Sequence, residues 1–191
     1  NKATITMVAE DLNDILQGAN TTTIEQPSSF LITINTERLD ASTDLDLVNI
    51  VIHESIHATL FYFLNNGSFT SSNTSYAQLV EDFTKHQAGF GSDHHEYMAS
   101  LVNHITDASY NWAIKNGYSL NSFTEFDTTA NPKNGLQEYL GKLAWSGLTS
   151  TDTFEKFYLP GSLEYKNIIN MINSESLPYE NTAKPKGKTC N

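Results

Sequence analysis

The 191-residue chain contains a single cysteine, Cys190, next to the C-terminus. One cysteine cannot form an intrachain disulfide, and it excludes zinc sites built from several cysteines. Lysine and arginine are also scarce, with 11 residues against 22 aspartates and glutamates, for a formal net charge of −11. Because phosphate backbones are bound by clustered basic side chains, we expect no nucleic-acid partner. No apolar run approaches the length of a transmembrane helix, so we expect no membrane partner either.

The length and composition suit one globular domain with a buried core. Hydrophobic residues make up 39% of the chain and charged residues 17%, which is typical of enzymes and of binding modules alike. We expect a single domain over residues 1–179 and a flexible tail over 180–191, which carries three lysines and a proline. The chain starts at Asn1 rather than at a methionine, so a signal peptide can precede it and the compartment stays open.

Hydrophobic periodicity predicts the secondary structure. Apolar residues at helical spacing predict an amphipathic helix over residues 4–17, before Gly18. The short run at 30–34, rich in β-branched and aromatic residues, predicts a strand. Residues 45–64 are apolar on nearly all sides, which is typical of a buried helix. Further helices are predicted near residues 76–86, 94–116, 135–146, 152–158 and 162–173.

An HExxH sequence, His53-Glu54-Ser55-Ile56-His57, lies inside the predicted buried helix. Residues four apart share one face of a helix, so both imidazoles can reach a single metal ion. Glu54 then lies one position round the helix, where it can act on a metal-bound water without binding the metal itself. Unpaired polar groups in a buried helix cost on the order of several kcal/mol, and a metal ion would supply one partner.

The third metal ligand is expected from the segment His94-His95-Glu96. All six histidines lie between residues 53 and 104, and a catalytic zinc usually takes three protein ligands and one water. His95 is favoured because it shares a helix face with the small Ala99, which allows close approach to a neighbouring helix. His94 is the second candidate, although a packing role is favoured for it, and Glu96 is the third.

The segments HESIHA at 53–58 and DHHEYMA at 93–99 resemble zinc metallopeptidases of the SprT-like family, within the zincin group. The resemblance covers roughly residues 30–116. It implies that His53, His57 and His95 bind Zn²⁺ and that Glu54 is the catalytic glutamate. The chain departs from many members because one cysteine cannot build their zinc ribbon. Its acidic composition also does not support the DNA-linked role of some members.

The expected fold is α+β and zincin-like, with a small sheet packed on the HExxH active-site helix and a mostly helical C-terminal part. An extended peptide can add to a sheet edge in such folds, and residues 30–35 are the candidate edge strand. The expected function is zinc-dependent hydrolysis of a peptide or protein substrate, with Glu54 activating a zinc-bound water. Candidates for stabilising the developing oxyanion are Tyr97, Tyr110 and His94.

The alternative function is a non-catalytic zinc-binding or partner-binding domain on a zincin-like scaffold. The fourth coordination position separates the two, because water there supports an enzyme and a protein side chain supports structural zinc. A buried HExxH can also hold hydrogen-bonded structural histidines with no metal. A serine hydrolase is disfavoured because the chain has no GxSxG sequence.

Overall fold

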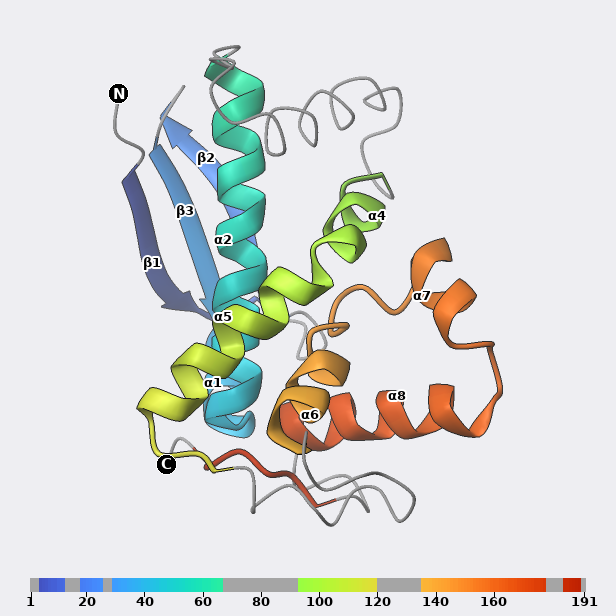
Figure 1. The fold of residues 1–191 in the computed structure, drawn as a ribbon. Coiled ribbons are helices and arrows are strands. Elements are labelled where there is room, and N and C mark those ends of the chain that lie inside the picture. The colour runs from blue at the N-terminus through green and yellow to red at the C-terminus, as the bar shows by residue number, and fades with distance from the viewer. Residues whose placement is uncertain are drawn as a thin grey trace.

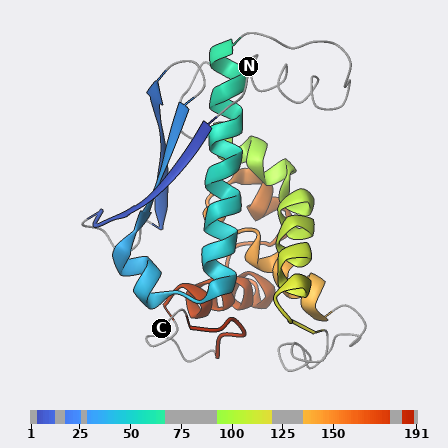
Figure 2. The same ribbon diagram turned by 90° about the vertical axis from the view of Figure 1, so that its left-hand side faces the viewer.

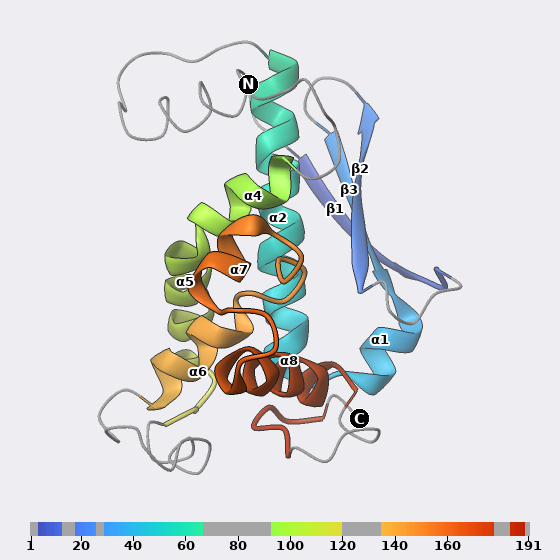
Figure 3. The same cartoon turned by 90° about the vertical axis from the view of Figure 1, so that its right-hand side faces the viewer.

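A three-stranded sheet lies along one side of a long central helix, α2 (Asp44–Asn66), and further helices pack on its other side (Figure 1). This computed structural model describes residues 4–12, 18–25, 29–66, 93–119, 135–177 and 184–189. The same layering is visible when the molecule is turned to either side (Figures 2 and 3). The predicted α+β class is therefore confirmed, and most of the described chain is helical.

The sheet has the strand order β1-β3-β2, with β1 at Thr4–Glu10, β2 at Ala19–Glu25 and β3 at Ser29–Asn35. β3 pairs in parallel with β1 and antiparallel with β2. Its Phe30 and Ile32 side chains are buried, which agrees with the strand predicted at 30–34. The prediction that residues 30–35 form an edge strand is wrong, because β3 lies in the middle of the sheet. The edge strand that contacts α2 is β2.

Residues 4–10 form strand β1 and not the start of the helix that we predicted over residues 4–17. Four of the five residues in the sequence TITMV are β-branched, which restricts χ1 and favours an extended backbone. The apolar spacing that suggested a helix does not mark a buried face, since Ile5 is 40% and Met7 49% exposed. Pairing with β3 along the whole strand decides the conformation instead.

The central helix α2 confirms the helix predicted over residues 45–64. A short helix, α1 (Thr36–Ala41), links it to β3 and is capped by the Asn35 side chain, which accepts a hydrogen bond from the Glu37 N–H. α2 begins after Thr43, whose hydroxyl oxygen accepts the Asp46 N–H at 3.3 Å. Because α2 lies between the sheet and the other helices, it is enclosed on several sides, as its sequence predicted.

The later helices follow the predicted pattern, with one break. α4 (Asp93–Ser100) and α5 (Val102–Lys115) occupy the helix predicted over residues 94–116 and meet at Leu101. α6 (Gly135–Leu143), α7 (Asp152–Phe157) and α8 (Leu163–Ser176) match the three predicted near the end of the chain. The helix predicted over 76–86 lies outside the described residues. None of the described helices is long and apolar enough to cross a membrane. The core between these helices includes Leu45, Met98, Ile105, Leu140, Phe154 and Ile168.

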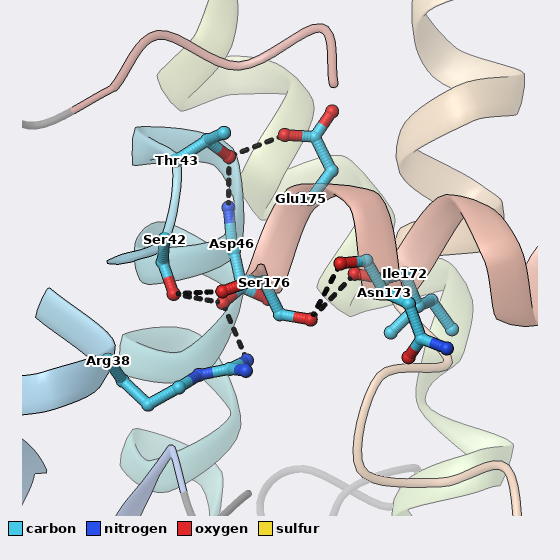
Figure 4. A network of polar contacts seen from close by, with 8 residues as sticks. All are labelled: Arg38, Ser42, Thr43, Asp46, Ile172, Asn173, Glu175 and Ser176. Carbon is cyan, nitrogen blue, oxygen red and sulfur yellow. Dashed lines mark hydrogen bonds and ion pairs between the residues drawn. The ribbon is translucent and has the colours of Figure 1, made fainter. Parts of the chain in front are cut away.

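Residues 184–189 lie against the start of α2 and the end of α8. The Glu175 carboxylate, fully buried, accepts the backbone N–H groups of Lys186 at 2.6 Å and Gly187 at 3.1 Å. It also accepts the Thr43 hydroxyl, within a polar network that joins α8 to α2 (Figure 4). The Lys188 N–H donates to the Asp44 carboxylate at 2.9 Å. These hydrogen bonds tie residues 186–188, part of the segment 180–191 for which we expected a flexible tail, to α2 and α8.

Candidate metal centre

Three histidines from two helices meet at one point beside α2. His53 and His57 lie one turn apart on α2, with their Nε2 atoms 3.0 Å apart. His95, in the first turn of α4, brings its ring centroid to 5.6 Å from that of His53 and 5.4 Å from that of His57. One ligand nitrogen from each ring lies within 4.8 Å of the others. The structure therefore brings together the three histidines that the sequence singled out, and this group could hold a metal ion.

The spacing of these nitrogens fits a small metal ion. A tetrahedral zinc with Zn–N bonds of about 2.0–2.1 Å needs ligand nitrogens about 3.4 Å apart. The 3.0 Å between His53 and His57 lies just below that value and the 4.8 Å limit for the set lies above it, so small ring movements close the site. Burial lowers the pKa of His95 and so favours the neutral imidazole that binds a metal. His53 and His57 are only 9% and 8% exposed.

Glu54 provides a buried carboxylate beside the histidines and is 8% exposed. The Thr21 hydroxyl of strand β2 donates to Glu54 Oε2 at 2.6 Å and lies 3.1 Å from the Glu54 carbonyl oxygen. Burial raises the pKa of Glu54, and the hydrogen bond from Thr21 opposes this rise. A raised pKa suits a carboxylate that takes up and returns a proton near neutral pH. Thr21 was not foreseen, because no local pattern connects it to a residue 33 positions later.

The histidines and Glu54 line one cavity of about 390 Å³. Its lining includes Gly18 and the first three residues of β2, and the face of α2 that carries Asn49, His53 and His57. Arg38 also lines the cavity, and the turn at residues 146–147 borders the His53 ring. The site therefore lies between the edge strand of the sheet and the helical part of the domain.

Gly147 packs directly against the His53 ring. A Cβ atom at this position would lie 2.9 Å from His53 Cε1 and 3.3 Å from its Nδ1. The backbone there has φ +79°, a left-handed conformation that glycine adopts without strain. In the sequence Gly147 indicated only a helix end, but in the fold its missing side chain makes room for the imidazole.

Glu96, an alternative third ligand, has a different role. Its carboxylate accepts the backbone N–H groups of Asp152 and Thr153 and the Thr153 hydroxyl, the last at 2.7 Å. The two N–H groups lie in the first turn of α7, where they have no acceptor within the helix itself. The helix dipole also favours a carboxylate at this position. Glu96 therefore ties α4 to α7 and does not belong to the described metal-binding group.

The other secondary candidates do not lie at the cavity as far as the structure describes them. Tyr97 and Tyr110 pack against the hydrophobic core and are not among the described residues that line the cavity. The side chain of His94 lies outside the described part of the chain, so its proposed role stays a prediction. His104 is exposed on α5, away from the three grouped histidines.

Comparisons of the chain with protein-family models, with curated proteins and with solved structures found no match. What the site can do chemically follows from its own residues. Three imidazoles provide a donor set that suits zinc and neighbouring transition metals. A buried carboxylate adjoins them, and both open onto a cavity beside a sheet edge.

Proposed function

We propose that the protein is a zinc-dependent peptidase of zincin-like fold. In this proposal His53, His57 and His95 hold Zn²⁺, and Glu54 acts as general base. The observation that carries it is the convergence of three imidazole nitrogens within 4.8 Å in a cavity that also contains the Glu54 carboxylate. The resemblance of HESIHA and DHHEYMA to SprT-like metallopeptidases supports the same function.

A catalytic centre is favoured over structural zinc by the number of protein ligands. The described residues provide a group of three histidines, with no fourth histidine, cysteine or carboxylate in it. Three protein ligands leave one coordination position for water or substrate, as in catalytic zinc sites. The cavity supports this reading because it gives a substrate access to that position.

In the proposed reaction the metal ion, Glu54 and Thr21 have separate roles. Bound zinc supplies a Lewis acid that polarises the scissile carbonyl and lowers the pKa of a coordinated water to about 7. Glu54 accepts the proton of the attacking water and later returns it to the leaving amine. The Thr21 hydroxyl orients the Glu54 carboxylate, and the raised pKa of Glu54 makes it a better proton acceptor.

The proposed substrate is an extended peptide that adds to the free edge of β2. Within the described residues no strand pairs with that edge, and Ala19, Asn20 and Thr21 border the cavity. A peptide that forms main-chain hydrogen bonds there would run past Glu54 and the histidines. This placement positions one peptide bond for attack without requiring a deep side-chain pocket.

Zinc binding and hydrolysis test the proposal together. Protein stripped with a chelator should take up one zinc per chain and regain cleavage of an unfolded protein substrate. His95→Ala should lose most of its zinc affinity and its activity, because two imidazoles hold zinc weakly. His104→Ala is the matched control on the exposed face of α5 and should keep both. One tightly bound zinc in His95→Ala, or no zinc uptake by the wild type, would contradict the proposal.

A further inference from the structure

The cavity that the histidines line is also lined by a second polar group, formed by Arg38 and Asn49. Asn49 lies four residues before His53 on α2, so both side chains project from one face of the helix. Arg38 reaches the cavity from α1. Neither residue takes part in the hydrolysis proposed above, and no sequence pattern singled out either one.

Each of these side chains is buried and has a polar atom without a partner. Arg38 is 7% exposed and Asn49 2% exposed. Within the described part of the chain, the Arg38 Nε–H has no hydrogen-bond acceptor and Asn49 Oδ1 accepts no hydrogen bond. Buried polar groups are nearly always hydrogen-bonded, and an unpaired one is costly. Both residues line the cavity, and the two unpaired atoms each have less than 1 Å² of accessible surface, so a bound group reaches them after a small side-chain movement.

The charges at this end of the cavity favour a neutral ligand. Arg38 Nη2 donates to Asp46 Oδ2 at 2.9 Å, and the same oxygen accepts the Ser42 hydroxyl at 2.8 Å (Figure 4). The guanidinium therefore already has a buried counter-charge. Because Arg38 and Asp46 already neutralise each other, a ligand gains little here from carrying a charge of either sign.

A neutral group that fits both unpaired atoms must offer an acceptor to Arg38 and a donor to Asn49. A carboxamide does so, and in a peptide it comes from a Gln or Asn side chain or from the main chain. A main-chain peptide group is trans and turns its N–H and C=O in opposite directions. A side-chain carboxamide carries both on one carbon, so it can reach two partners from one direction. This favours the side chain.

Gly18 packs closely against Ile50, next to Arg38. A Cβ atom on Gly18 would lie 2.9 Å from Ile50 Cδ1 and 4.0 Å from Arg38 Nε. A side chain at position 18 would therefore clash with Ile50, so the glycine lets the chain before β2 pack closely against Ile50 and Arg38. One helical turn rises about 5.4 Å, the span of one or two residues in an extended peptide, so this end lies close to the scissile bond.

We propose that Arg38 and Asn49 form a subsite for a side-chain carboxamide, which gives a preference for Gln or Asn within one or two residues of the cleaved bond. The identity of the ligand as part of a peptide rests on the peptidase function proposed above. The subsite itself rests on the burial, the unpaired atoms and the cavity at Arg38 and Asn49.

The test uses zinc-loaded protein and peptides of one sequence that carry Gln, Glu or Met in turn at each position. These three side chains have similar length and differ in hydrogen bonding and charge. Cleavage is measured with the wild type, and binding is measured by calorimetry with Glu54→Gln. At one position the Gln peptide should be preferred about tenfold in both measurements. Equal results for all three side chains, or a preference for Glu, overturn the proposal.

Variants then connect the preference to Asn49. Asn49→Leu removes the acceptor while keeping the branched shape of the side chain, and it should abolish the Gln preference with zinc content unchanged. Asn111→Leu makes the same change on the exposed face of α5 and should retain the preference. A Gln preference that survives Asn49→Leu contradicts the subsite. A peptide in which an ester replaces one backbone amide gives a further test. If that replacement weakens binding equally for the Gln, Glu and Met peptides, the site binds the main chain and the subsite proposal is contradicted.

The two proposals can fail separately in this experiment. Gln-selective binding to Glu54→Gln without cleavage by the wild type would end the peptidase proposal and leave the subsite standing. Cleavage by the wild type with no side-chain preference would support the peptidase proposal and overturn the subsite.

Discussion

Replacing Gly147 by alanine should weaken metal binding through the His53 ring. The new Cβ would lie 2.9 Å from His53 Cε1, a separation that side-chain carbons do not tolerate. The Gly147 backbone has φ +79°, so alanine there is strained as well. Two effects therefore combine, one on folding and one on the metal site, and they can be separated with a second glycine.

Gly161 provides the matched control, since it has φ +81° and no described atom within 4 Å of an added Cβ. A left-handed conformation costs a non-glycine residue about 1–2 kcal/mol, so both alanine variants should lose about that much folding stability. Only Gly147→Ala pushes on the imidazole. Disturbing the groups that orient a metal ligand typically lowers metal affinity about 10–100-fold, and we expect a loss in that range.

The assay measures two quantities on each variant. Urea unfolding of the metal-free protein gives the stability change, and competition with a zinc-binding dye gives the zinc affinity. We expect similar stability losses in Gly147→Ala and Gly161→Ala, with reduced zinc affinity in Gly147→Ala alone. Wild-type zinc affinity in Gly147→Ala, or an equal loss in both variants, would refute the role assigned to this turn.

Two further substitutions test contacts around the site. Thr21→Val removes the hydrogen bond to Glu54 and should lower kcat about tenfold at saturating zinc, with zinc content unchanged; an unchanged kcat would show that Glu54 needs no such support. Glu96→Ala removes the carboxylate that caps α7 and should cost about 1 kcal/mol of stability in thermal unfolding, since capping groups contribute on this scale. Glu96→Ala should still bind one zinc, and complete loss of zinc would identify Glu96 as a ligand.

The local elements that could be predicted from the sequence are those with a strong pattern of their own. The central helix α2 was predictable because residues 45–64 are apolar on nearly every side. β1 was not, because its apolar residues fit a helix equally well and only pairing with β3 decides between them. The position of β3 inside the sheet depends on strands on both sides, and residues 30–34 contain no information about those partners.

The candidate site divides in the same way. The HExxH spacing identifies His53 and His57. His95 was favoured because of the small Ala99, and it does meet the other two histidines, but Ala99 itself lines a different cavity beside α5, α6 and α7. Thr21 and Gly147 come from distant segments that only the folded chain brings together. Their roles, an oriented carboxylate and space for an imidazole, depend on tertiary contacts that have no local sequence signature.

The most direct test of the peptidase proposal compares the zinc-loaded wild type with Glu54→Gln on an unfolded protein substrate. Both proteins should contain one zinc, because Glu54 is not part of the histidine group. The wild type should cleave the substrate, and Glu54→Gln should not, because glutamine cannot accept the proton of the attacking water. Cleavage by Glu54→Gln at the wild-type rate, or no cleavage by wild-type protein with one zinc bound, would contradict the assignment of this site as a peptidase centre.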